Sequence, residues 1–244
     1  MIRLIVIFIY LILYLILSLP VLLAEWIIGK FNPQLKDKSS KALVSWGFRC
    51  IQHLAGVKLI VLGRENIPMD TAVLYVGNHR SFFDIVLTYA RVPRPTSYVS
   101  KIEIKKVPLL NLWMMLLHCT FLDRKDAKRG LQTILTNIEL MKKGVSVCIF
   151  PEGTRNHEEG TFLPFHDASF KIASKSGCPV LPMALTNTGD IFEDHFPWIK
   201  RTRAVLRYGK PVYIQDLDKE QQKNVGEYFR GIIADMYEEN RKLL

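Results

Sequence analysis

A histidine and an aspartate five positions apart are the residues of this sequence whose types and spacing suit catalysis most directly. His79 and Asp84 stand between two apolar runs, 72–76 and 85–90, which have the pattern of a strand and a helix. On one continuous α-helix the two side chains would point about 140° apart, because each residue turns by roughly 100°. They meet if His79 lies on the turn and Asp84 on the first helical turn. An aspartate that fixes the tautomer of a histidine makes that histidine a general base.

The alternative interpretation of His79 is a buried histidine whose hydrogen bond to Asp84 serves only the structure. Its place just after a strand favours catalysis, because open α/β sheets hold their sites beyond the carboxyl ends of the strands. The neighbouring residues also suit a sharp turn. Gly77 permits the turn itself, and either Asn78 or Ser81 would cap the helix that follows.

A second turn of the same kind follows the apolar strand expected at 146–150. Gly153 allows close backbone approach, Thr154 offers a hydroxyl, and Arg155 offers a planar fork of donors that suits phosphate. Free backbone N–H groups at such a turn also attract anions. The GxxxxGK[ST] spacing of a Walker loop is missing, so the turn by itself is a weak signal for phosphate.

A third expected strand end places Arg124 within reach of the same crevice. Asp123 and Arg124 directly follow the apolar run 119–122. The alternative for Arg124 is a surface salt bridge with Asp123 or Asp126.

Four short motifs follow one another between residues 78 and 182: NHxxxxD at 78–84, an apolar pair with Asp-Arg at 121–124, FPEGTR at 150–155, and a VPVxP-like strand at 178–182. In this order they resemble the motifs of the glycerolipid acyltransferase family, most closely those of its 1-acyl-sn-glycerol-3-phosphate (lysophosphatidic acid) acyltransferases. Asn156 stands where the third motif usually has serine, and Cys178 departs from the fourth motif, which puts only fine substrate contacts in doubt.

The resemblance implies a role for each of these residues. His79 takes the proton of the sn-2 hydroxyl of 1-acyl-glycerol-3-phosphate, which attacks a fatty acyl thioester to give phosphatidic acid without an acyl-enzyme. Asp84 orients His79 and stabilises its imidazolium. The remaining residues bind the acceptor: Arg124, Gly153, Thr154 and Arg155 hold the glycerol phosphate, Glu152 helps to position the glycerol, and Lys101 assists with charge.

The family's reaction uses no metal or redox cofactor, and its donor is acyl-CoA or an acyl-carrier protein, which the sequence does not distinguish. Three other functions stay open. The acceptor is glycerol 3-phosphate or another lysophospholipid in other branches of the family. A membrane esterase is disfavoured because there is no GxSxG elbow. A non-catalytic lipid-binding protein is disfavoured by the intact pair of His79 and Asp84.

Strands that alternate with helices after residue 57 predict an α/β sheet with helices on its faces, and the resemblance makes that a mixed sheet. The apolar helix expected at 109–117 is a buried core helix, a lining for an acyl chain, or a surface that enters the lipid. Strands are expected at 58–62, 72–76, 96–100, 119–122, 146–150, 180–186 and 204–207, with a short addition at 212–214, and further helices at 126–143, at 167–176 and from 219 onward.

Residues 1–56 are expected to form a two-helix membrane anchor ahead of an α/β acyltransferase domain at 57–244. The run 4–23 is long and apolar enough to cross a bilayer or to enter one leaflet and return. A cleaved signal peptide is the alternative, although its apolar region is normally shorter. Basic residues concentrate after the run, which predicts a cytoplasmic domain, with a bacterial inner membrane as the expected location. The second helix, 41–55, either touches the membrane or packs on the domain.

The formal net charge of +10 suits nucleic acid or an anionic membrane surface. No nucleic-acid-binding motif accompanies it, which favours the membrane. The four cysteines are far apart and lie mostly in apolar runs, as expected for buried, reduced thiols rather than a metal cluster.

Overall fold

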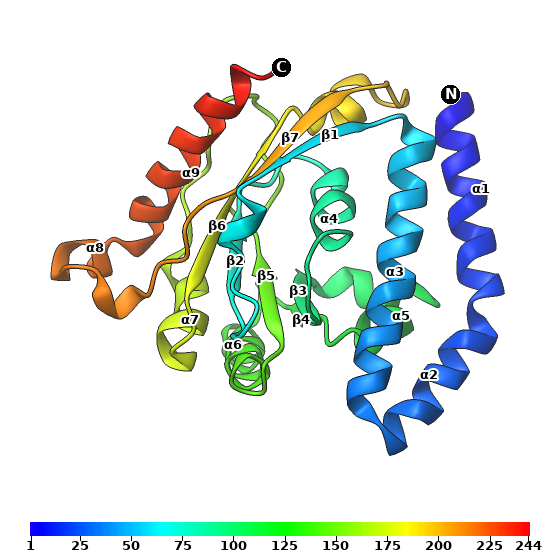
Figure 1. The fold of residues 1–244 in the computed structure, drawn as a ribbon, viewed down its shortest axis with the longest axis horizontal. Helices are drawn as coiled ribbons and strands as arrows, with labels where there is room; N and C mark the ends of the chain where they lie inside the picture. The colour runs from blue at the N-terminus through cyan, green and yellow to red at the C-terminus, as the bar shows by residue number, and fades with distance from the viewer.

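A computed structural model describes all residues, 1–244. Its centre is a seven-stranded sheet in the order β1-β7-β6-β2-β5-β3-β4 (Figure 1). Every neighbouring pair is parallel except β6 and β7, which are antiparallel. The strands are β1 (Lys58–Leu62), β2 (Leu74–Gly77), β3 (Thr96–Lys101), β4 (Thr120–Leu122), β5 (Ser146–Ile149), β6 (Val180–Thr186) and β7 (Arg203–Tyr208). The prediction of a mixed α/β sheet is therefore confirmed. The extra strand predicted at 212–214 is wrong, because Val212 makes only an isolated bridge to Val180.

Helices cover both faces of the sheet, as Figure 1 shows. Successive residues of a strand point to opposite faces. Leu74 of β2 packs in one core cluster with α6, α7 and α9, whereas Tyr75 packs in another with α3, α4 and α5. The helices are α1 (Ile2–Leu17), α2 (Leu19–Phe31), α3 (Pro33–Ala55), α4 (Phe82–Tyr89), α5 (Leu110–Leu116), α6 (Ala127–Lys142), α7 (Lys171–Ser176), α8 (Lys219–Lys223) and α9 (Val225–Arg241).

The N-terminal segment has three helices where the sequence predicted two. Pro20 lacks an N–H to donate to the carbonyl four residues earlier, so it fits in the first turn of a new helix. The chain accordingly bends by 47° between α1 and α2. α3 begins at Pro33, well before the predicted residue 41, because the side chain of Asn32 accepts a hydrogen bond from Leu35 N at 3.0 Å and caps the helix. No single helix passes the length and hydropathy test for a membrane span, whereas α1 and α2 pass it as a bent pair.

α5 joins these N-terminal helices to the edge of the sheet. The indole N–H of Trp113, a buried residue, donates to Ser18 Oγ at 2.9 Å, at the bend between α1 and α2. The ammonium group of Lys36 on α3 donates to the carbonyl of Leu116 at 3.0 Å. One side of α5 is therefore core, while Met115 on another side is 47% exposed.

The strands that precede the sequence motifs run side by side. β2, β5, β3 and β4 are consecutive and parallel in the sheet. Their carboxyl ends therefore meet at one edge, which is where an open α/β sheet holds its site.

Candidate active site

His79 and Asp84 lie together on the turn between β2 and α4. His79 Nδ1 is 2.9 Å from Asp84 Oδ2. The same carboxylate oxygen accepts hydrogen bonds from the backbone N–H groups of Arg80 at 2.7 Å and Ser81 at 2.8 Å. Asp84 is completely buried, and the Ser81 side chain completes the capping box at the start of α4. The turn and first helical turn bring the pair together as the spacing predicted.

The imidazole of His79 is held so that its second nitrogen stays available. Its ring stacks on Phe150 with centroids 4.3 Å apart and planes tilted by 17°. Nδ1 is occupied by Asp84, and Nε2 makes no hydrogen bond within the chain. The ring is thus fixed on one side by a carboxylate and an aromatic face, and the free Nε2 can accept a proton from a bound hydroxyl.

Glu152 holds the backbone of this turn. Its Oε1 accepts from His79 N at 2.7 Å and its Oε2 from Leu163 N at 3.0 Å. The N–H of Asn156 donates to the carbonyl of His79 at 2.8 Å. Burial raises the pKa of Glu152, and the two backbone N–H groups oppose that rise. Both carboxylate oxygens accept from protein N–H groups, and the contact with glycerol that the resemblance implied stays a prediction.

Arg155, in the turn after β5, extends its side chain over the start of α4 and has a carboxylate partner. Its Nη1 is 3.0 Å from Glu193 Oε1, and its guanidinium carbon lies 3.8 Å above the ring of Phe82. Glu193 also accepts from Phe82 N at 2.8 Å and from the Ser81 hydroxyl at 2.6 Å. Arg155 is therefore fixed next to the catalytic turn, with its side chain 30% exposed.

Arg124 approaches the second turn from a different strand end. A Cβ placed on Gly153 would lie 3.6 Å from the guanidinium carbon of Arg124 and 3.4 Å from the ring of His166. Gly153 has φ +73°, a conformation that only glycine adopts readily. The structure thus brings Arg124 and Gly153 together, as expected, and Arg124 is exposed and forms no ion pair.

Thr154 and Lys101 occupy exposed positions at the same edge. Thr154 follows Gly153 and makes no hydrogen bond through its hydroxyl. Lys101 is the last residue of β3, pairs in register with Leu122, and forms no ion pair. Both side chains are free to bind an anion.

Known proteins are similar to this chain in sequence and in fold. A family model described as Acyltransferase matches residues 58–186, which is just over half of the chain. The chain belongs to the acyltransferase family. The 1-acyl-sn-glycerol-3-phosphate acyltransferase of Saccharomyces cerevisiae is 28% identical over 197 residues, which cover 78% of this chain and 65% of that protein. The chloroplastic enzyme BAT2 of Brassica napus, which carries the same activity in its name, is 38% identical over 164 residues, or 64% of this chain and 45% of that protein.

A solved member of this family has the same fold. The crystal structure of the 1-acyl-sn-glycerophosphate acyltransferase from Thermotoga maritima superposes with a TM-score of 0.82 at 23% identity, over 98% of this chain and 95% of that one. The sequence matches span less than two thirds of the length of the curated relatives from yeast, Brassica napus and Borreliella burgdorferi.

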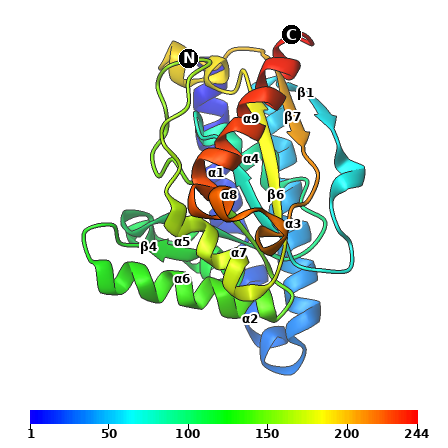
Figure 2. The ribbon, with the colours of Figure 1, turned by 90° about the vertical axis from the view of Figure 1, so that its left-hand side faces the viewer.

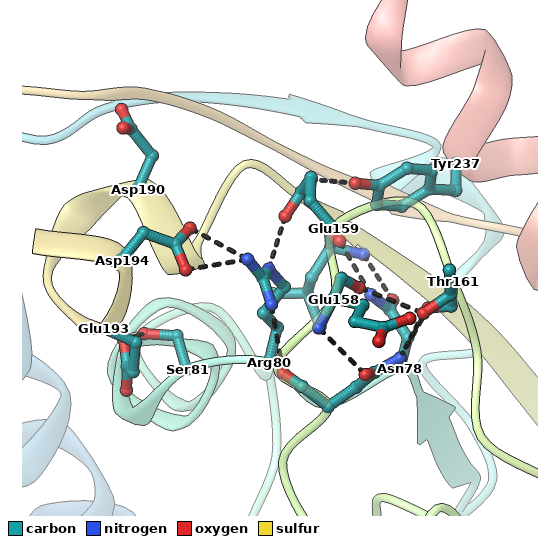
Figure 3. Close-up of polar contacts among 12 residues, drawn as sticks. Asn78, Arg80, Ser81, Glu158, Glu159, Thr161, Asp190, Glu193, Asp194 and Tyr237 are labelled. Atoms are coloured by element: carbon teal, nitrogen blue, oxygen red, sulfur yellow. Dashed lines mark hydrogen bonds and ion pairs between the residues drawn. The ribbon is translucent and has the colours of Figure 1, made fainter.

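Arg80, inside the NHxxxxD motif, is the centre of a network of ion pairs that the sequence analysis did not predict. Figure 3 shows the Arg80 guanidinium between two acidic side chains. Its Nη2 contacts the Asp194 carboxylate at 2.7 and 2.9 Å, and its Nε pairs with Glu159. Nη1 donates to the carbonyl of Asn156 at 3.1 Å, and Glu159 also binds the hydroxyl of Tyr237 on α9. Arg80 therefore connects the turn between β2 and α4 to the loops after β5 and β6.

The sequence places Arg80 inside the NHxxxxD motif, but a spacer position of a motif does not indicate that its side chain is buried or paired. Glu193 and Asp194 lie more than 100 residues later, in a loop without helical or strand periodicity, so no local pattern connects them to the turn.

Proposed function

We propose that this protein is a 1-acylglycerol-3-phosphate O-acyltransferase, which transfers a fatty acyl group from an acyl thioester to the sn-2 hydroxyl of lysophosphatidic acid. The observation that carries the proposal is the His79–Asp84 pair, which leaves Nε2 free at the edge where four parallel strands end. The names of the related proteins point to the same acceptor.

The chain's own groups account for the proton and for the charges of such a transfer. His79 Nε2 accepts the proton of the acceptor hydroxyl as its oxygen attacks the thioester carbonyl. The C–S bond then breaks, and the thiolate leaves with the proton that His79 returns. Asp84 keeps Nδ1 protonated and stabilises the imidazolium that forms in between. No acyl-enzyme, metal or redox cofactor takes part in this scheme.

The acceptor phosphate is proposed to bind between two sets of donors. Arg124, Gly153 and Thr154 form one side and Lys101 extends it along the strand ends. Arg155 forms the other side beside α4. Arginine forks and free backbone N–H groups both suit a phosphate dianion. Glu152 is proposed to act indirectly, by holding the turn that carries His79.

Membrane attachment through residues 1–56 completes the proposal, since the acceptor and product are lipids. α1 and α2 together are long and apolar enough to enter a bilayer, and the basic surface suits anionic lipid on the cytoplasmic side of a bacterial inner membrane. The intact protein should remain with membranes after a carbonate wash. Clean release by salt would mean that the attachment is only electrostatic.

The deciding experiment is thioester release by purified protein with a panel of acceptors and both donor classes. Lysophosphatidic acid should be the best acceptor with acyl-CoA or acyl-carrier protein, and His79→Ala should abolish the signal. A preference for glycerol 3-phosphate or another lysophospholipid would move the protein to a different branch of the family. Thioester release without any acceptor would indicate an esterase.

A further inference from the structure

The loop that follows β6 exposes two aromatic side chains that nothing in the chain covers. Phe196 is 72% exposed and Trp198 is 54% exposed. The residues on either side of them, Ile191 and Ile199, are buried in a core cluster. The loop is therefore anchored to the core by Ile191 and Ile199, and its two aromatic side chains are directed toward solvent.

This loop lies against the N-terminal helix. The guanidinium of Arg3 donates to the carbonyl of Ile199 at 3.3 Å, and Ile7 of α1 shares a core cluster with Ile191 and Ile199. Figure 2 shows the loop next to the N-terminus, at one end of the molecule. The adjacent α1 has its own exposed apolar residues, among them Ile2, Ile5, Phe8, Ile9 and Ile12. Exposed apolar side chains therefore occur on both of these neighbouring elements.

The acidic and basic residues of the loop differ in their pairing. Its carboxylates all have partners within the chain: Glu193 pairs with Arg155, Asp194 with Arg80, and Asp190 with His195 at 2.6 Å. The cations that follow Trp198 are exposed and form no ion pair; they are Lys200, Arg201 and Arg203. The charges of the loop that have no partner within the chain are therefore all basic.

We propose that segment 192–203 is a second membrane-contact surface, which seats Phe196 and Trp198 in the headgroup region of an anionic bilayer. Aromatic rings prefer that depth, and each nearby cation is attracted by anionic lipid. The same loop holds the catalytic turn through Glu193 and Asp194, so its contact with lipid fixes how the active site faces the bilayer. The proposal rests on the membrane attachment proposed above and deepens it.

The lipid contact is tested with the full-length protein in vesicles of phosphatidylcholine and phosphatidylglycerol whose acyl chains carry bromine near the headgroups. Bromine quenches tryptophan fluorescence only at short range. The chain has four tryptophans, and Trp26 and Trp46 are exposed on the N-terminal helices while Trp113 is buried. If Trp198 contacts lipid, the absolute emission that bromination removes should be smaller in Trp198→Phe than in the parent at equal protein concentration. A loss of emission equal to the parent's, or larger, would overturn the proposal.

A second variant tests the consequence for orientation. Phe196→Ser/Trp198→Ser should reduce kcat/KM about five- to ten-fold for an acceptor presented in anionic vesicles, with little change for a short-chain acceptor in free solution. The matched control is Tyr213→Ser, an exposed aromatic in the stretch before α8. Figure 1 shows α8 on the side of the sheet away from α1. Equal losses on both acceptors would contradict the orienting role.

The quenching measurement needs no turnover, so it separates this proposal from the proposed activity. A protein that transfers acyl groups to no acceptor, yet loses quenching in Trp198→Phe, would refute the activity and keep the lipid contact. If the double variant instead lowers the oligomeric mass in detergent without any effect on quenching, the surface binds another copy of the chain and the proposal fails.

Discussion

Glu193 Oε1 lies 3.0 Å from Arg155 Nη1, so the arginine expected to bind the acceptor phosphate has a carboxylate partner before any acceptor arrives. The same glutamate is bonded to the first residues of α4. The pair positions Arg155 beside the turn that carries His79 and Asp84, and the Arg155 side chain is 30% exposed. In the proposed phosphate site, the guanidinium would bind the anion through the donors that Glu193 does not hold.

Truncation of Arg155 should weaken use of a phosphorylated acceptor specifically. A charge-assisted hydrogen bond contributes about 1.5–3 kcal/mol, so Arg155→Ala should lower kcat/KM for lysophosphatidic acid roughly ten- to hundred-fold. Arg155→Lys should restore only part, because it keeps the charge but not the planar fork. The measurement is kcat/KM for this acceptor in the parent and both variants.

The control for Arg155 is a neutral acceptor such as monoacylglycerol. It should be a poor substrate of the parent and lose little more in Arg155→Ala. Proportional losses on both acceptors, together with a lowered Tm, would mean that Arg155 only maintains the fold through Glu193.

Substitution of the proposed catalytic pair, His79 and Asp84, should cause the largest loss of turnover. His79→Ala should lower turnover by roughly a hundred- to ten-thousand-fold with the circular dichroism spectrum unchanged. Asp84→Asn should be nearly as severe, because an amide at this position favours the wrong imidazole tautomer. It also replaces an oxygen that accepts from two backbone N–H groups, so its Tm should be measured alongside. Near-normal turnover in His79→Ala would end the assignment.

Parts of this site could be predicted because their contacts are local or follow from the sheet. His79 and Asp84 are five residues apart on one turn, and Arg124 and Gly153 follow strands at the same edge. The remaining contacts depend on tertiary packing that no spacing encodes. Glu193 contacts Ser81 from a loop more than 100 residues later in the chain. That loop has no helix or strand periodicity, so nothing in the sequence distinguished Glu193 from an ordinary solvated glutamate.

The same distinction explains the fold. Strand and helix patterns after residue 57 were strong enough to give the sheet, whereas the anchor was predicted from hydropathy alone. Hydropathy does not register that Pro20 interrupts a helix or that Asn32 starts one. Both signals were present as residue types, and they determine the three-helix arrangement of residues 2–55.

The raised pKa of Glu152 makes stability depend on pH. Burial is the main cause, and it lifts the pKa of this carboxyl above its ordinary 4.5. The folded protein therefore binds this proton more tightly than the unfolded chain does. The contribution to stability is greatest below the unfolded value and falls as pH rises through the folded-state pKa.

Glu152→Gln isolates this effect, since glutamine does not titrate. The difference in free energy of unfolding between parent and Glu152→Gln should shift against the parent between about pH 4 and about pH 7. Urea unfolding at both pH values measures it. A difference that stays constant, or that shifts in favour of the parent, would contradict a raised pKa.

The network around Arg80 should couple the loops after β5 and β6 energetically. The Arg80 side chain is only 9% exposed, but its acidic partners Asp194 and Glu159 are about a third or more exposed. Solvent therefore weakens each pair, and we expect a coupling energy of about 1–2 kcal/mol between Arg80 and Asp194 in a double-mutant cycle. The variants are Arg80→Gln, Asp194→Asn and their combination, with the free energy of unfolding as the readout. A matched control is the Arg230–Glu227 pair, three residues apart on the exposed face of α9, whose coupling should stay near 0.2–0.5 kcal/mol.

Because the Arg80 guanidinium also holds the carbonyl of Asn156, whose N–H binds the carbonyl of His79, Arg80→Gln should reduce kcat as well as stability, and Arg80→Lys should recover stability more than kcat. Equal coupling in the two cycles, or full recovery of kcat by lysine, would mean that the Arg80 ion pairs have no part in positioning His79.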